Sequence, residues 1–268
     1  MNYNLSHISS LVLRIIPAGL LFIAILFIDA IQDQPLQSFL LNLLIYVPVI
    51  LPFLKFGFPV RVISISDSKF QFYFFAKVFR LQIIVLCISL SIFYGLSDNN
   101  SYWFIFLCIS IASINAMVFN YGSLLIRRGV IKGFLFQNGV FNLVIFIQSA
   151  ILVFTVQEFS AGFLLGFLIF FSFMALFLNL DGAYIRVHNS TNLNFKSWLV
   201  DVTSTFYAPL LLLLAMSFYE SPNAGIFFVM KVGFFISGVI GSLIVLSIKK
   251  LDKNSHQNYH SGFKLIKK

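Results

Sequence analysis

The sequence predicts an all-α protein that crosses a membrane with about eight helices. Hydrophobic residues make up 59% of the 268 positions and charged residues only 10%, and the mean hydropathy is +0.95. This composition is incompatible with an ordinary soluble domain. The apolar residues fall in runs of about 20, which is the length that crosses a hydrocarbon core about 30 Å thick. We therefore expect a polytopic helical membrane protein.

Eight apolar segments, separated by polar or charged stretches, justify the helices in order. They span residues 8–31, 36–59, 78–96, 102–126, 134–156, 161–180, 198–218 and 224–248. The start lacks the basic region and small-residue cleavage pattern of a signal peptide, so we expect the first helix to remain in the mature protein. The segments predict a six-helix block at 1–190, a helical hairpin at 191–250 and a polar cytoplasmic tail at 251–268.

The basic residues indicate the orientation of these helices. Seventeen of the 18 Lys and Arg residues fall at or near one face of the predicted membrane protein, whereas the loops around Asp33, Asp98, Glu158 and Glu220 contain none. Basic residues are retained on the cytoplasmic side, so both termini are predicted to lie in the cytoplasm. The net charge of +9 then indicates contact with anionic membrane lipids and requires no nucleic-acid partner.

Two further patterns concern how the helices pack. Segment 61–77 mixes aromatic and basic residues, which fits either a stretch along the headgroup boundary or a plain loop. Gly162 with Gly166, and Ser237 with Gly241, have the spacing of small residues that lets two helices approach closely. We interpret both pairs as packing positions.

No pattern in the sequence indicates catalysis. The four histidines lack metal-ligand spacing, and there is no phosphate-binding glycine loop, nucleophile elbow or carboxylate pair. Cys87 and Cys108 lie in apolar segments, where packing is the favoured interpretation. We therefore expect a protein that is not an enzyme and that uses no cofactor and no metal.

Five polar side chains within the apolar segments are candidates for lining a cavity. A lysine such as Lys231, seven residues inside its segment, costs about 2.5–3.5 kcal/mol against lipid and is expected to face a watery interior. Arg14 and Arg80 lie nearer helix ends, where they either face that interior or anchor at the interface. Asp201, just inside its segment, is a candidate for lining the same cavity. Asn142 either contacts a molecule bound in the cavity or bonds one helix to another.

Three stretches, KFGFPVR at 55–61, IRRGVIKGFLFQNGVFN at 126–142 and SPNAGIFFVMKV at 221–232, together resemble a known family, the polysaccharide flippases of the multidrug/oligosaccharidyl-lipid/polysaccharide exporter superfamily. KFGFPVR at 55–61 is similar to the end of their second helix, an apolar residue and Phe-Gly-apolar-Pro followed by Arg. Residues 126–142, with IRRG before a helix that contains two asparagines, are similar to their middle segment. SPNAGIFFVMKV at 221–232 resembles the entry to their eighth helix.

The resemblance implies a function for the chain. Members of the family have two six-helix lobes and move undecaprenyl-linked oligosaccharides across the inner membrane by alternating access. The lipid-linked oligosaccharide then serves assembly of O-antigen, capsule or exopolysaccharide. Cations such as Lys231 in a wet cavity would offset the cost of moving its pyrophosphate. A gradient would drive this transport, because the sequence has no nucleotide motif.

The chain departs from that plan in length. It contains the first lobe and only two helices of the second. One interpretation is a shortened homologue that a homo-oligomer completes, and another is a truncated or inactive homologue with a structural role. A third is an exporter of small cationic compounds, which would need buried acids facing the cavity. More cations than acids are candidates there, which favours the anionic lipid-linked substrate.

Overall fold

The computed structural model describes residues 2–64, 68–96, 102–127, 133–155, 160–177, 195–217, 225, 227–229 and 231–233. The chain divides into two units, 1–227 and 228–268, and each is described by itself. The described residues contain helices and no strands, which confirms the all-α prediction for this part of the chain. The helices are α1 (Asn2–Asp29), α2 (Gln34–Leu54), α3 (Phe58–Ser64), α4 (Ser68–Leu96), α5 (Trp103–Arg127), α6 (Gly133–Phe154), α7 (Ala161–Phe177) and α8 (Phe195–Ser217).

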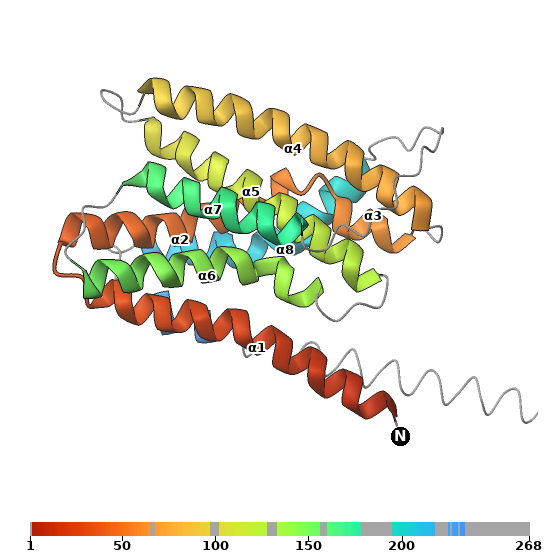
Figure 1. Cartoon of the computed structure of the whole chain (residues 1–268), viewed down its shortest axis with the longest axis horizontal. Coiled ribbons are helices and arrows are strands. Elements are labelled where there is room, and N and C mark those ends of the chain that lie inside the picture. The colour runs from red at the N-terminus through yellow and green to blue at the C-terminus, as the bar shows by residue number, and fades with distance from the viewer. Residues whose placement is uncertain are drawn as a thin grey trace, which may run out of the picture. The chain divides into compact units, whose positions relative to one another are not determined.

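Helix α5 lies at the centre of the first unit, in contact with α2, α3, α4, α6 and α7. In Figure 1, α4, α5, α6 and α1 follow one another across the view, in agreement with the packing of each on the next. The buried hydroxyl of Ser110 donates to the Phe106 carbonyl oxygen at 2.8 Å, so its polarity is satisfied within α5. The Ser89 hydroxyl oxygen of α4 lies 2.9 Å from the Ser110 hydroxyl oxygen, within hydrogen-bonding distance. Short polar side chains can therefore occupy an otherwise apolar helix interface.

Residues 30–33 connect α1 to α2. Asp33 begins α2, because its Oδ1 accepts a hydrogen bond from the Leu36 amide at 3.3 Å and so satisfies one of the free N–H groups of the first turn. The side chain of Gln37 donates to the carbonyl oxygens of Ile28 and Asp29, both at 3.3 Å. These two carbonyls belong to the last turn of α1, where no intrahelical donor remains for them.

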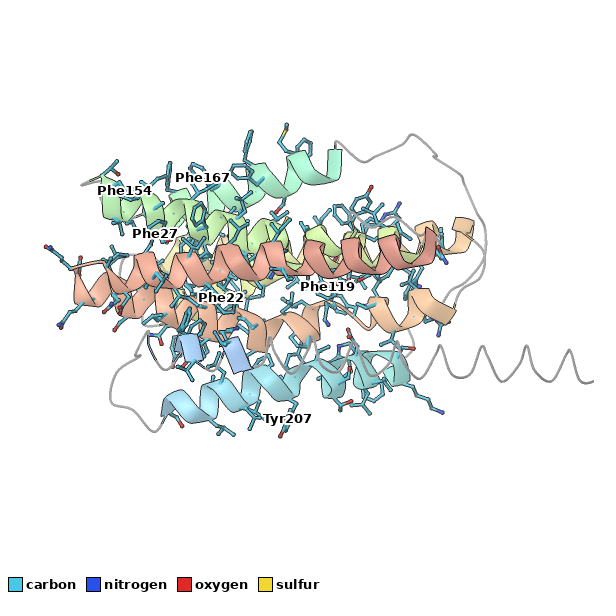
Figure 2. The ribbon with its side chains drawn as sticks, turned by 90° about the horizontal axis from the view of Figure 1, so that it is seen from below. Phe22, Phe27, Phe119, Phe154, Phe167 and Tyr207 are labelled. Atoms are coloured by element: carbon cyan, nitrogen blue, oxygen red, sulfur yellow. The ribbon has the colours of Figure 1, made fainter. Side chains whose placement is uncertain are left out.

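Aromatic rings pack α1 against α6. The ring of Phe27 lies 5.7 Å from the ring of Phe146 and 5.7 Å from that of Phe154, and Figure 2 labels Phe27 and Phe154 where the two helices meet. A Cβ built on Gly139 of α6 would lie 3.7 Å from Pro17 Cγ of α1, which is ordinary van der Waals contact.

The surface of the first unit is strongly apolar. Phe154, Phe173 and Tyr207 are 75%, 65% and 67% exposed, and Tyr207 points away from the bundle in Figure 2. Large exposed apolar areas indicate contact with a membrane or a partner. In the described residues, Gln34–Leu54, Tyr73–Leu96 and Trp103–Leu125 are long and apolar enough to cross a membrane. These features indicate a membrane protein, while the count of eight spans stays a prediction.

The predicted helix 36–59 is wrong at its end. The backbone turns at Phe56 and Gly57, whose φ angles of 53° and 66° lie in the left-handed region that no helix of L-residues continues through. Helix α2 therefore ends at Leu54, and the short α3 begins at Phe58. Pro59 comes next, in the first turn of α3, where the missing N–H removes no helical hydrogen bond.

The plain-loop interpretation of segment 61–77 is also wrong. Its first residues belong to α3, and α4 begins at Ser68, ten residues before the predicted helix start at residue 78. The reason is that two of its aromatic rings are buried against protein. Phe74 and Phe75 pack with the rings of Phe58 and Tyr121, and their ring centroids lie 5.5–5.6 Å apart.

The small-residue pairs have a mixed outcome. A Cβ on Gly162 would lie 3.6 Å from the Tyr94 hydroxyl of α4, which is ordinary van der Waals contact, so the packing role of Gly162 stays a prediction. At Gly166 no atom of another helix lies within 4 Å of that position, and the packing prediction is wrong there because this face of α7 is exposed. Ser237 and Gly241 lie outside the described residues.

Gly57 provides a test of the turn between α2 and α3. A Cβ at this position would lie 2.5 Å from the Trp198 backbone nitrogen, and the φ of 66° is itself unfavourable for alanine. We expect Gly57→Ala to lower the unfolding free energy by at least about 2 kcal/mol through strain and the displacement of α8. Thermal unfolding of the purified protein in detergent measures this effect.

Gly166→Ala is the matched control for Gly57→Ala. Position 166 lies within α7 with open space around it. Alanine there is expected to change stability by no more than about 1 kcal/mol, in the stabilising direction, because it is the better helix former. Equal melting temperatures for the two variants would contradict the close approach at Gly57.

Candidate functional site

A charged pair is buried where the end of α2 meets α8. The Lys55 ammonium donates to Asp201 Oδ1 at 3.0 Å, and both side chains are 3% exposed. Lys55 is the residue that ends α2, and Asp201 lies in the second turn of α8. The two residues are 146 positions apart in the sequence, so the fold alone brings them together.

The Lys55 ammonium has three partners. Besides Asp201, it donates to Thr205 Oγ1 at 3.4 Å and lies 4.8 Å from the centre of the Phe119 ring. Thr205 can accept this bond because its own hydroxyl proton is directed to the Asp201 carbonyl oxygen, at 2.6 Å. A carboxylate, a hydroxyl and an aromatic face together meet the three donors of an ammonium group. Asp201 and Thr205 belong to α8, whereas Phe119 belongs to α5, within the bundle in Figure 2.

Side-chain amides hold the backbone at the end of α2. Asn120 of α5 donates to the Lys55 carbonyl oxygen at 3.2 Å, and Gln82 of α4 donates to the Leu54 carbonyl oxygen at 2.9 Å. The last carbonyls of a helix lack intrahelical donors. Gln82 supplies a donor to the Leu54 carbonyl, and Asn120 adds a second donor to the Lys55 carbonyl, which also accepts from the Phe58 amide at 3.1 Å. The position of Lys55 is therefore fixed from α4 and α5 independently of α8.

The first turn of α8 lies directly on the α2–α3 turn. Gly57 approaches the Trp198 backbone so closely that a side chain at 57 would overlap it. The Trp198 indole nitrogen donates to the Phe53 carbonyl oxygen at 3.1 Å, which satisfies a further group in the last turn of α2. The rings of Phe53 and Phe206 lie 5.3 Å apart with a T-shaped arrangement. These contacts set the register that aligns Asp201 with Lys55.

The pair is electrostatically stable only while both partners are present. The end of α2 carries a partial negative charge, which favours the Lys55 ammonium there. Removing one partner of a buried pair leaves an uncompensated charge and costs about 3–5 kcal/mol. Asp201 Oδ2 is buried, and within the described part of the chain no group donates a hydrogen bond to it. Asp201 thus binds through one oxygen only.

The predicted site residues fall in different surroundings. Asp201 is buried against Lys55, and Asn142 of α6 donates to the Pro17 carbonyl oxygen of α1 at 2.8 Å, the helix-to-helix alternative of the sequence analysis. Arg80 is exposed on α4. Arg14 lies in α1, and its side chain lies outside the described residues. Lys231 is helical and belongs to the second unit. The structure therefore brings none of the other candidates to Asp201 within the described residues of the first unit.

Sequence reasoning missed Lys55 as the partner of Asp201. Lys55 was assigned to the cations of the cytoplasmic face. The second helix was predicted to run to residue 59, so the turn that buries Lys55 was not predicted. The available signal was the Phe-Gly pair directly after Lys55, since glycine favours a left-handed backbone. Within the described residues, no three His, Cys, Asp or Glu side chains are grouped so as to hold a metal ion.

A double-mutant cycle tests the buried pair. Lys55→Met and Asp201→Leu are each expected to lower the unfolding free energy by about 3–5 kcal/mol, because each leaves one charge buried alone. The double variant is expected to be more stable than either single variant, since it buries no charge. Thermal or denaturant unfolding in detergent gives the three values.

A second cycle on exposed residues is the control. Lys196 lies at the exposed start of α8, and the Asp29 side chain is exposed at the end of α1. Lys196→Met and Asp29→Leu are expected to have small, additive effects. Additive losses at Lys55 and Asp201 as well would show that the two buried charges do not depend on each other.

Comparison of the chain with family models, with curated proteins and with solved structures finds no match. The buried pair and its surroundings, together with the sequence patterns, are therefore the observations on which a functional argument rests.

Proposed function

We propose that the protein moves undecaprenyl-linked oligosaccharides across the inner membrane for assembly of a surface polysaccharide, by alternating access. One observation carries the proposal. The family-like stretch 55–61 is the one that forms the α2–α3 turn, supplies Lys55 and receives α8. The residues that resemble a flippase are thus those that join the predicted six-helix block to the predicted second-lobe hairpin.

Alternating access requires such a joint. Two helical blocks must separate and close again around a cargo, and discrete contacts between them set the two states. Within the described residues, α8 packs mainly on α2 and α3. A single buried ion pair at that joint can then shift the equilibrium between the two states of the helical blocks. The apolar outer surface and the long apolar helices support a membrane setting for it.

The cargo follows from the cations. Lys231, Arg14 and Arg80 are proposed to contact the pyrophosphate of the lipid carrier, with Asp201 near the path of the sugars. Anionic membrane lipids would bind the basic cytoplasmic face, and a second copy of the chain would complete the shortened second lobe. Both termini would lie in the cytoplasm. An exporter of cationic compounds is less well supported, because Asp201 is neutralised by Lys55.

Reconstitution into vesicles tests the proposed transport. Vesicles that contain the purified protein and a lipid-linked oligosaccharide are treated from outside with periodate, which oxidises only the sugars of the outer leaflet. We expect the protein to extend oxidation from the outer-leaflet pool to nearly the whole pool, because flipped sugars become accessible. Protein-free vesicles and a fluorescent phosphatidylcholine, which should stay in its leaflet, are the controls.

Oxidation limited to the outer-leaflet pool would contradict the flippase. If the protein restores polysaccharide assembly in cells that lack it but flips no substrate in vesicles, the structural role is indicated instead. Gradient-dependent efflux of a cationic dye without flipping would indicate the exporter.

Lys231 gives a residue-level test. Lys231→Ala removes an ammonium from a predicted membrane segment, and we expect it to abolish polysaccharide export in cells while the protein level is unchanged. Lys196→Ala removes a cation from the exposed start of α8 and is expected to leave export intact. Measurement is by immunoblotting of surface polysaccharide and of the protein. Unaltered export in Lys231→Ala would remove this lysine from the proposed site.

A further inference from the structure

The partners of Lys55 divide into two groups according to the helix that carries them. Asp201 and Thr205 come from α8, whereas the Phe119 ring comes from α5. The backbone of Lys55 is bound by Asn120 of α5, with Gln82 of α4 on the preceding carbonyl. If α8 moves away, the ammonium keeps its aromatic face and its fixed backbone, and it loses its anion and its hydroxyl acceptor.

The anion that Lys55 now holds is attached weakly for a buried group. Asp201 uses one carboxylate oxygen, and its other oxygen has no donor within the described residues. A fully bound buried carboxylate would use both oxygens. The ammonium is thus well satisfied while the carboxylate is not, and the asymmetry favours replacement of the carboxylate by an anion with more acceptor oxygens.

We propose that Lys55 binds phosphate, and that Asp201 takes the place of this phosphate in the closed state, in which α8 packs on α2. A phosphate of the lipid-linked substrate replaces Asp201 when α8 opens. The inference rests on the proposed function, whose substrate it would recognise. The pyrophosphate of the substrate carries more negative charge than a single carboxylate and has more acceptor oxygens, and lysine is a common phosphate ligand. Exchange of one anion for another never leaves the buried ammonium unpaired, which removes the main barrier to opening.

The exchange also accounts for the position of the pair at the α2–α3 turn. The contacts that Asp201 and Trp198 make with this turn are the ones that hold α8 in place. When a phosphate takes the ammonium, α8 loses its only ion pair to α2 among the described residues. The freed carboxylate of Asp201 then passes to water as α8 separates. Binding of the headgroup and opening of the joint are therefore one event.

Binding of undecaprenyl phosphate to the purified full chain in detergent tests the site. Native mass spectrometry gives the affinity for undecaprenyl phosphate, for uncharged undecaprenol and for inorganic pyrophosphate. We expect Asp201→Asn to bind undecaprenyl phosphate about tenfold more tightly, because the internal competitor loses its charge. Lys55→Gln is expected to bind it about tenfold more weakly. Undecaprenol should bind all variants alike.

Matched variants separate this effect from a general change of charge. Asp29→Asn and Lys196→Gln change exposed residues by the same charges, and their affinities should equal that of the unaltered chain. Lys55→Gln with Asp201→Asn buries no charge and so avoids the instability of a broken pair. It should bind undecaprenyl phosphate no better than undecaprenol. Unaltered affinity in Asp201→Asn, or retained affinity in the neutral double variant, would overturn the proposal.

The two probes identify the source of the phosphate. Lys55-dependent binding of undecaprenyl phosphate well above that of inorganic pyrophosphate supports a lipid headgroup. Equal Lys55-dependent affinities support the phosphate site and overturn its assignment to a lipid. Failure of this inference is distinguishable from failure of the flippase. Flipping that persists in the neutral double variant overturns the Lys55 site alone, whereas Lys55-dependent binding without flipping contradicts the transport function alone.

Discussion

The buried ion pair between Lys55 and Asp201 is the interaction on which the arrangement of α8 depends. A charge in an apolar interior is tolerated only with a partner and with its remaining donors satisfied. The chain meets that condition with groups from two other helices, since Thr205 of α8 and Phe119 of α5 contact the ammonium and Asn120 of α5 binds the Lys55 carbonyl oxygen. The left-handed turn at Phe56 and Gly57 follows from the same condition, because it ends α2 at Lys55 and lets the first turn of α8 lie against it.

Hydropathy predicted the starts of the long apolar helices well. Helices α5, α6 and α7 begin within one residue of the predicted starts, at Trp103, Gly133 and Ala161. Long apolar runs bounded by polar residues leave few alternatives for the backbone, since every N–H must be paired inside its own helix. The prediction failed in segment 61–77, where the helical residues are mixed with cations. There the burial of Phe74 and Phe75 against α3 and α5 decides the structure, and a window of hydropathy contains no information on that contact.

The candidate site was only half predictable for a related reason. A lone aspartate such as Asp201 near the start of an apolar helix attracts notice because its burial is costly. Lys55 did not attract notice, because a lysine at a helix end is usually a solvated anchor. Only the turn after Lys55 buries this side chain. A contact between residues 146 positions apart depends on the packing of α8 on α2, which no local pattern encodes. Asn142 was predicted with two roles, and its bond to Pro17 identifies one of them.

The chemistry of the site favours exchange over permanent attachment. An ion pair with a purely structural role is most stable when the carboxylate is bound through both oxygens. Such a pair gains no stability from having its cation and its anion positioned by different helices. Here α4 and α5 hold the backbone and ring that position Lys55, whereas α8 alone supplies the carboxylate. The binding site for an anion is thus complete without α8, and Asp201 occupies it as a ligand would. On the proposed function, a helix held through such an occupant is released by an anion of suitable shape that reaches the ammonium, and closure of the joint is then sensitive to the charge of the substrate.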